Sequence, residues 1–164
     1  MTHYRIRRAE VSDAPIVAHH RVEMFKEMGE LPAGAVAPVE STSRARLVEE
    51  LASGEYRGWL AEAGGEVVAG AGALLHKYYP SAANPSGRPT AYILNVYTEP
   101  AHRRQGLARR LILEILEWCR AHDIPRASLH ASLSGRSVYA QLGFVETNEM
   151  RVDAGAARPT PTGT

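Results

Sequence analysis

Two spacings of apolar residues occur along the chain, and together they predict a mixed α/β domain. Short runs in which apolar residues alternate or follow one another predict strands over His3–Arg8, Tyr56–Glu62, Val67–Tyr78, Ala91–Thr98, Ala127–Ala131 and Phe144–Val152. Apolar residues three and four positions apart predict helices at about Asp13–Met28, from Ser43 to near Gly54, from Ala108 to near Asp123, and over Gly135–Leu142. The predicted order is β-α-α-β-β-β-α-β-α-β.

Turn residues separate these elements and suggest how the strands pair. Gly64-Gly65 lies between two predicted strands and is typical of a hairpin, whereas the Pro- and Gly-containing segments Gly29–Pro38 and Pro80–Pro89 read as loops. The unit Ala91–Ala131 reads as a parallel strand-helix-strand crossover. We therefore expect one mixed, mostly antiparallel sheet of six to seven strands, with this parallel unit at its centre and helices on both faces.

Length and composition indicate one globular domain. The chain has 164 residues, of which 45% are hydrophobic and 23% are charged, as in an ordinary globular protein with a hydrophobic core. The segment after residue 153 is rich in Ala, Gly, Pro and Thr. We expect a single domain over residues 1–153 and a disordered tail over residues 154–164.

Charge and cysteine content indicate the cellular compartment and the kinds of binding partner. The net charge is +1, so bulk charge favours neither nucleic acid nor an anionic membrane, and Cys119 is the single cysteine, which cannot form an internal disulfide. The charged start of the chain has no apolar run, and no stretch approaches the ~20 apolar residues of a membrane helix. We expect a cytoplasmic protein with neither a nucleic-acid nor a membrane partner.

A nucleic-acid-binding protein is nevertheless an alternative, because several arginines gather near the start of the chain and around residue 105. They are Arg5, Arg7, Arg8, Arg103, Arg104, Arg109 and Arg110. Acidic residues balance them, and no RNA- or DNA-binding motif accompanies them.

The segment Arg103–Ala108 carries the most informative chemistry. It follows a buried strand and opens a helix, where unpaired backbone N–H groups favour an anion. Gly106 lets a ligand approach the backbone, and Arg103 and Arg104 add positive charge, so a phosphate or pyrophosphate is the expected ligand. A plain basic helix start at the surface is the alternative. The sequence has neither the P-loop nor the GxGxxG pattern.

Three motifs carry a family resemblance. Arg103-Arg104-Gln105-Gly106-Leu107-Ala108 resembles the [QR]-x-x-G-x-[GA] signature of the GNAT N-acetyltransferases, and Ser137–Phe144, about thirty residues later, resembles their terminal LY-x-x-L-G-F element. Ile6-Arg7-Arg8-Ala9 followed by Asp13 resembles their opening motif. The resemblance spans nearly the whole chain. It implies the GNAT fold and transfer of an acetyl group from acetyl-CoA to an amine.

The resemblance also implies roles for individual residues. Tyr139 matches the tyrosine that protonates the departing CoA sulfur, and Asn95 could bind the acceptor or a water, or be a buried amide. The residues expected at acetyl-CoA are Val96, Tyr97, Thr98, Arg103, Arg104, Gln105, Gly106, Leu107, Ala108 and Ser132. Many members carry Asn where this chain has Ser132, and a hydroxyl can still form a hydrogen bond there.

The acceptor side is less determined. We expect the loops Gly29–Pro38 and Ser81–Pro89 to frame a pocket for a cationic amine of a small molecule or peptide, with acidic charge and aromatic surface. The residues expected there are Glu27, Glu30, Tyr78 and Tyr79. The general base is open among Glu23, Glu27, Glu30, His130 and a water.

The remaining expectations concern a metal, the oligomeric state and catalysis itself. We expect no metal, and a homodimer is compatible with the resemblance. The alternative to an enzyme is a non-catalytic CoA-binding or regulatory module that kept the fold.

Overall fold

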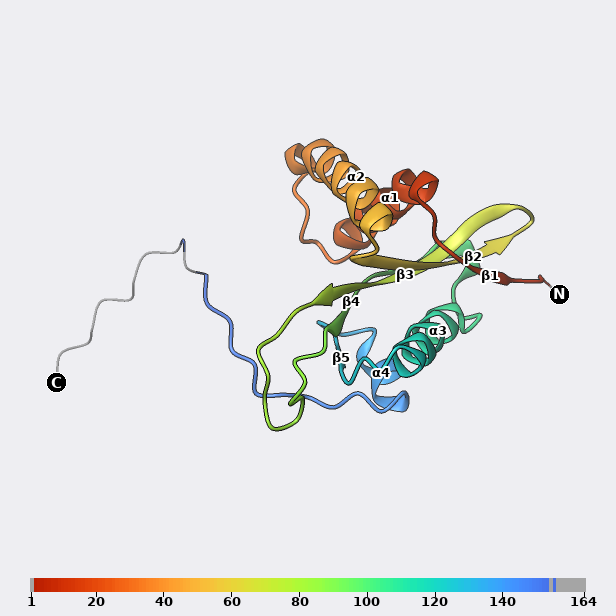
Figure 1. Cartoon of the computed structure of the whole chain (residues 1–164). Coiled ribbons are helices and arrows are strands. Elements are labelled where there is room, and N and C mark those ends of the chain that lie inside the picture. Colours follow the sequence, from red (N-terminus) through yellow and green to blue (C-terminus); the bar gives the residue numbers. More distant parts are fainter. Residues whose placement is uncertain (1, 154, 156–164) are drawn as a thin grey trace.

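The fold is one five-stranded mixed sheet with helices on both faces (Figure 1). A computed structural model describes residues 2–153 and 155. The strands lie in the order β1-β2-β3-β4-β5, and their bounds are Arg5–Arg8, Tyr56–Ala63, Glu66–His76, Thr90–Thr98 and Ala127–Ser128. The first four strands pair antiparallel, and β4 pairs with β5 in parallel.

Two layers of helix enclose the sheet. Helices α1 (Ala14–Glu27) and α2 (Val36–Ser53) lie on one face, and α3 (Leu107–Ala121) and α4 (Arg136–Gln141) lie on the other (Figure 1). Short 3-10 turns, η1 to η3, cover Val11–Asp13, Ala33–Ala35 and Pro100–His102. The predicted helices on both faces and the parallel strand-helix-strand unit β4-α3-β5 are therefore confirmed.

Each face of the sheet has its own hydrophobic core. On the α3 face, Leu111, Ile112 and Ile115 are fully buried against the small and apolar residues of β2 to β4. On the α1/α2 face, Val17 and Leu47 pack against Tyr56 and Leu60, among others. Burial of this apolar area is the main stabilising contribution on both sides.

The prediction of six to seven strands is wrong, because the sheet has five. The predicted last strand, Phe144–Val152, is irregular, and its residues Val145, Met150 and Val152 are more than 80% exposed. Four consecutive polar residues, 146–149, leave it without an apolar face to bury. The predicted strand Ala127–Ala131 shortens to two residues, and the parallel unit lies at the edge of the sheet and not at its centre.

Two further predictions need correction or lie outside the described residues. Helix α2 begins at Val36, seven residues before the predicted start, because Pro38 lies in its first turn, where a missing N–H costs no hydrogen bond. The predicted loop over residues 29–38 is correspondingly shorter. The predicted disorder of residues 154–164 falls, apart from Gly155, outside the described residues.

Candidate active site

The strand β4 is irregular at Asn95. Opposite this point the register with β3 shifts, so that Gly70 pairs with Tyr97 but Gly72 pairs with Leu94. Two residues of β4 thus oppose one of β3, which is a β-bulge. Asn95 adopts a positive φ of 54°, a conformation that costs energy in a non-glycine residue and that Asn adopts more readily than most.

The bulge changes which face the side chains of β4 reach. Leu94 packs in the core on the α1/α2 face. Asn95 faces the same way, since its amide donates to the Tyr56 hydroxyl at 3.3 Å. Val96 then packs in the core on the α3 face. Leu94 and Asn95 therefore point to one side in succession, which a regular strand does not allow.

Near the same point, β4 separates from β5. The two strands pair only at Ala91↔Ala127 and Tyr92↔Ser128. Beyond Tyr92, the β5-facing edge of β4 has no strand partner within residues 2–153. An open strand edge presents backbone N–H and C=O groups that an extended ligand can bind, and Val96, Tyr97 and Thr98 lie along it.

The unpaired edge leads directly into the basic turn. After η3, the chain adopts a positive φ at Arg104 (59°) and at Gly106 (72°), and Leu107 begins α3. A Cβ added to Gly106 would have no heavy atom within 4 Å, so the space above this backbone is open. Gln105 is exposed, Ala108 is half-buried, and Leu107 is buried in the core. Successive N–H groups in such a turn favour an anion.

The Arg103 side chain is fixed toward α1. Its Nε donates to the carbonyl oxygen of Thr98 at 2.9 Å, and its Nη2 forms an ion pair with Glu27. The guanidinium also lies over the ring of Tyr97, with its central carbon 5.8 Å from the ring centroid. The ion pair raises the pKa of Arg103 above its usual value. Glu27 therefore lies against the basic turn.

Tyr139 comes from the short helix α4 on the α3 face. Its ring packs edge-on against Phe144, with centroids 5.8 Å apart, and contacts the main core. Gly135 makes room for it, because a Cβ at that position would lie 2.8 Å from the ring. Ser132 lies in the turn that precedes this helix, where its Oγ accepts from the Gly135 N–H at 3.2 Å. The Tyr139 phenol is protonated at neutral pH at its ordinary pKa, and burial raises that pKa further.

The comparisons with known proteins match this arrangement. The sequence model of the acetyltransferase (GNAT) family matches residues 23–144, which is most of the chain. This chain belongs to the GNAT acetyltransferase family. The match covers the bulged strand, the basic turn, Tyr139 and Phe144, and the protein is accordingly an acetyltransferase enzyme.

The chain is also similar in sequence to individual acetyltransferases. The GNAT chain is 32% identical over 111 residues to aminoglycoside N(6′)-acetyltransferase type 1 of Serratia marcescens, covering 65% of this chain and 75% of that one. It is 31% identical over 98 residues to rat N-acetyltransferase 8, covering 58% of this chain. That match spans only 42% of the rat protein.

Solved structures extend the likeness over nearly the whole chain. A GCN5-related N-acetyltransferase from Ralstonia eutropha is 32% identical, with a TM-score of 0.87, over 94% of this chain and all of that one. A predicted acetyltransferase from Clostridium acetobutylicum, solved with acetyl-CoA, is 25% identical with a TM-score of 0.84. That match covers 92% of this chain and 96% of the other.

A polar network on the α1/α2 face of this GNAT protein involves residues that the sequence did not single out. Arg21 of α1 donates to the Asn95 side-chain oxygen at 2.7 Å, and Asn95 in turn donates to Tyr56. Burial raises the pKa of Tyr56 to about 12. Gly72 makes room for the Tyr56 hydroxyl, because a Cβ at that position would lie 2.0 Å from it, a contact that is visible only in the structure.

A second network joins the diverging strands. The Tyr92 hydroxyl and His130 Nδ1 are hydrogen-bonded, and the ring of His76 stacks on Tyr92 with centroids 5.7 Å apart. His130 Nε2 lies 3.9 Å from a carboxylate oxygen of Glu149. His130, one of the predicted candidate bases, thus lies next to the point where β4 and β5 part.

The remaining predicted acceptor residues are not drawn together. Glu30 is exposed after α1, and Tyr78 and Tyr79 are 57% and 96% exposed at the start of the loop. Within the loop, Ser81 and Asn84 pair with each other as an isolated bridge. Asn95, the other predicted acceptor residue, lies on the bulged strand. Its side-chain amide is hydrogen-bonded to Arg21 and Tyr56.

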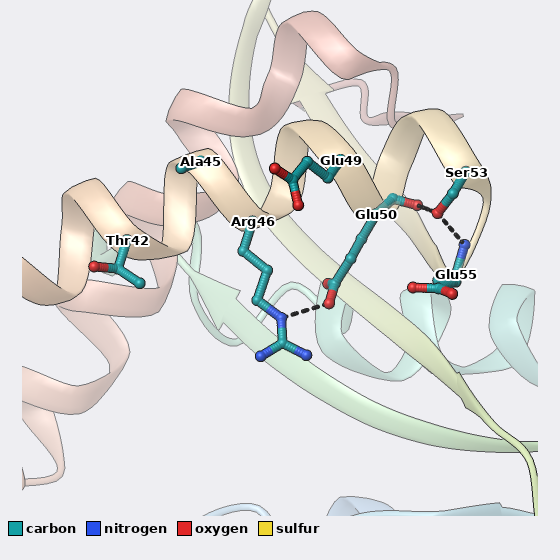
Figure 2. A pocket seen from close by; sticks show the side chains of 7 residues that line it. All are labelled: Thr42, Ala45, Arg46, Glu49, Glu50, Ser53 and Glu55. Atoms are coloured by element: carbon teal, nitrogen blue, oxygen red, sulfur yellow. Dashed lines mark hydrogen bonds and ion pairs between the residues drawn. The ribbon is translucent and has the colours of Figure 1, made fainter.

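A hollow on α2 is not part of this arrangement (Figure 2). Its lining residues are Thr42, Ala45, Arg46, Glu49, Glu50, Ser53 and Glu55. The charges of Arg46 and Glu50 in this hollow are paired, since Arg46 Nε lies 2.5 Å from a Glu50 carboxylate oxygen. It lacks the unpaired strand edge and the turn, so we do not assign the chemistry to it.

The described residues hold neither a metal site nor a membrane span. Within residues 2–153 and 155, no group of three or more His, Cys, Asp or Glu side chains could hold a metal ion. In the same part of the chain, no helix is long and apolar enough to cross a membrane.

Proposed function

We propose that this GNAT protein transfers the acetyl group of acetyl-CoA to an amine of a small molecule or peptide by direct attack. The observation that carries the proposal is the continuity of the unpaired β4 edge with the basic turn. An extended acyl carrier can bind the edge while its phosphates meet the turn. The C. acetobutylicum neighbour solved with acetyl-CoA supports this choice of donor.

The residues of this chain fit acetyl-CoA. Val96, Tyr97 and Thr98 offer backbone groups for the pantetheine arm, and N–H groups near Val96 and Tyr97 would polarise the thioester oxygen. The pyrophosphate would contact the turn, whose backbone is uncovered at Gly106. The turn residues proposed for it are Arg103, Arg104, Gln105, Gly106, Leu107 and Ala108, and Ser132 would line the opposite side.

Tyr139 is the proposed general acid. The amine nitrogen attacks the thioester carbon, a C–N bond forms, the C–S bond breaks, and the departing sulfur takes a proton. The Tyr139 phenol is protonated at neutral pH, as an ordinary phenol is, and burial raises its pKa further. The proton lost by the amine leaves through a water or a base, and His130 beside Tyr92 is the best-placed candidate.

The acceptor residues Glu27, Glu30 and Asn95, the cytoplasmic location, the homodimer and the absence of a nucleic-acid partner stay predictions. Aminoglycosides enter as candidate acceptors through the S. marcescens relative.

Binding of acetyl-CoA to the turn is tested with a matched pair of glycine variants. Gly106 and Gly64 both have positive φ and open space where a Cβ would lie, but Gly64 lies in the β2-β3 hairpin. Gly106→Glu puts bulk and negative charge beside the phosphates, whereas Gly64→Glu causes the same backbone strain elsewhere. Calorimetry should show lost acetyl-CoA binding only in Gly106→Glu. Equal affinities in both variants would remove the turn from the site.

Turnover separates the enzyme from the non-catalytic alternative. Release of free CoA thiol is measured with acetyl-CoA and a panel of amino acids, polyamines and aminoglycosides. Acetylation of any amine above the hydrolysis background supports the proposal. Tight acetyl-CoA binding without turnover on any amine would favour a regulatory module.

A further inference from the structure

Arg21 is a half-buried cation without a carboxylate partner among residues 2–153. Its Nη1 donates to Asn95 at 2.7 Å, and its guanidinium carbon lies 4.7 Å from the centroid of the Phe25 ring. Within the same residues, Arg21 forms no ion pair and no other hydrogen bond that meets the usual geometric limits. One of its five N–H donors is therefore used.

This pairing leaves the charge incompletely compensated. An amide and an aromatic ring are neutral partners, and burying a cation against neutral partners costs free energy that a carboxylate would offset. Burial lowers the pKa of Arg21 from its usual value, and the neighbouring carboxylate Glu50 raises it only weakly. Glu50 is already bonded to Arg46.

The position of Arg21 is as informative as its charge. Its hydrogen-bond partner, Asn95, directly precedes Val96, where we propose that the thioester binds. Tyr92, whose hydroxyl is hydrogen-bonded to His130, lies on the same strand three residues before Asn95. A ligand on the Arg21 guanidinium would therefore lie on the Asn95 side of β4, next to the backbone at which we propose that the acetyl group binds.

We propose that Arg21 binds a carboxylate of the acceptor, and that the acceptor is an amine that also carries a carboxylate, such as an amino acid or a related amino carboxylate. The proposal rests on the acetyl transfer proposed above and adds the substrate class. A planar guanidinium with free donors on one edge matches a carboxylate bidentately. Asn95 and Phe25 hold the guanidinium in place before the substrate arrives, which reduces the entropy lost on binding.

The test compares each amine as its free acid and as its primary amide. Pairs of α-amino acids and their amides, with β-alanine and its amide, are assayed for CoA thiol release, beside putrescine and an aminoglycoside. In the unsubstituted enzyme, we expect kcat/KM to be about 10- to 100-fold higher for the best acid than for its amide, mainly through KM.

Arg21→Met should reduce this acid-to-amide ratio to about one. The ratio is taken within each variant, so a general loss of activity from disturbing Asn95 cancels. Arg21→Lys keeps the charge but not the bidentate geometry and should retain part of the preference. Arg120→Met is the matched control, because Arg120 is exposed on α3 and paired with Glu117, and its ratio should equal that of the unsubstituted enzyme.

A second readout does not depend on turnover. Calorimetry of the preferred acid into CoA-saturated protein should show binding that Arg21→Met weakens about tenfold or more, while acetyl-CoA affinity changes little. Equal rates for acids and amides, or a preference for putrescine or the aminoglycoside, would overturn the inference and leave acetyl transfer standing. Absence of turnover on every amine would overturn the proposed function as well.

Discussion

Tyr139 is the residue on which the proposed mechanism can be tested most directly. Tyr139→Phe keeps the ring that packs against Phe144 and removes only the proton donor. We expect kcat to fall about 10²-fold, the low end for general acid catalysis because a thiolate leaves readily, with KM for acetyl-CoA nearly unchanged. Steady-state kinetics measures both, with Tyr79→Phe, an exposed loop residue, as the control. An unchanged kcat would exclude Tyr139 from the mechanism.

Glu27 separates two interpretations of the acidic residues of α1. The sequence predicts that it binds the acceptor, whereas the structure pairs it with Arg103 beside the turn. If the ion pair is its main role, Glu27→Gln should raise KM for acetyl-CoA by about 2- to 5-fold, as expected for an exposed pair, and leave the acceptor KM unchanged. Glu66→Gln, at the exposed first residue of β3, is the control. A rise confined to the acceptor KM would favour the sequence prediction.

Single residues show what the sequence could and could not predict. The open space above the backbone at Gly106 was predictable, because glycine has no side chain to cover it. Arg21 was not, because in sequence it is one of several charged residues on a helix. Its significance depends on Asn95, which is 74 positions away and turns toward α1 only because of the bulge.

Helices and strands were predicted well where an apolar face determines them. They were predicted poorly where they depend on pairing with a neighbouring strand. The hairpin of β2 and β3 followed from Gly64-Gly65, and α3 followed from its apolar stripe. Apolar residues at both ends of Phe144–Val152 suggest a strand, although the polar residues 146–149 between them leave no continuous apolar face. Whether it joins the sheet depends on β5 as its neighbour, and β5 is only two residues long.

Helix α3 is the element that supports the turn, and its buried face can be tested. Ile112 is fully buried in the core on the α3 face. Ile112→Ala should lower the free energy of unfolding by about 2–5 kcal/mol, through lost burial and the cavity that remains. Urea denaturation measures the change, and Glu114→Ala, at an exposed position of α3, should change it by less than about 0.5 kcal/mol. Equal losses would show that α3 packs differently.

At the scale of the whole molecule, His20 links folding to pH. Its side chain is 1% exposed, both ring nitrogens lack a hydrogen-bond partner among the described residues, and Nε2 lies 3.6 Å from a carboxylate oxygen of Glu99. Burial, with a smaller effect of His19, lowers the pKa of His20 from 6.5 to about 4. The unfolded chain therefore takes up the proton first as pH falls.

The consequence is a loss of stability over a defined pH range. His20 should leave stability unaffected above about pH 6.5 and lower it by about 1.4 kcal/mol per pH unit from there down to about pH 4. Urea denaturation between pH 7.5 and 4.5 should give a smaller pH dependence for His20→Leu than for the unsubstituted protein. His3→Gln, at an exposed position, serves as the control and should keep the original slope. Parallel profiles for all three proteins would contradict the assignment.

The bulge at Asn95 has a consequence for how new specificities arise. Because it turns Asn95 toward α1 while Val96 faces α3, the proposed donor and acceptor sites draw on elements from opposite faces of the sheet. Substitutions on α1 can therefore alter the choice of acceptor while the turn before α3 stays constant. In a directed-evolution library, changes of acceptor should accumulate at Arg21, Phe25 and their neighbours on α1, and Arg103–Ala108 should persist unchanged.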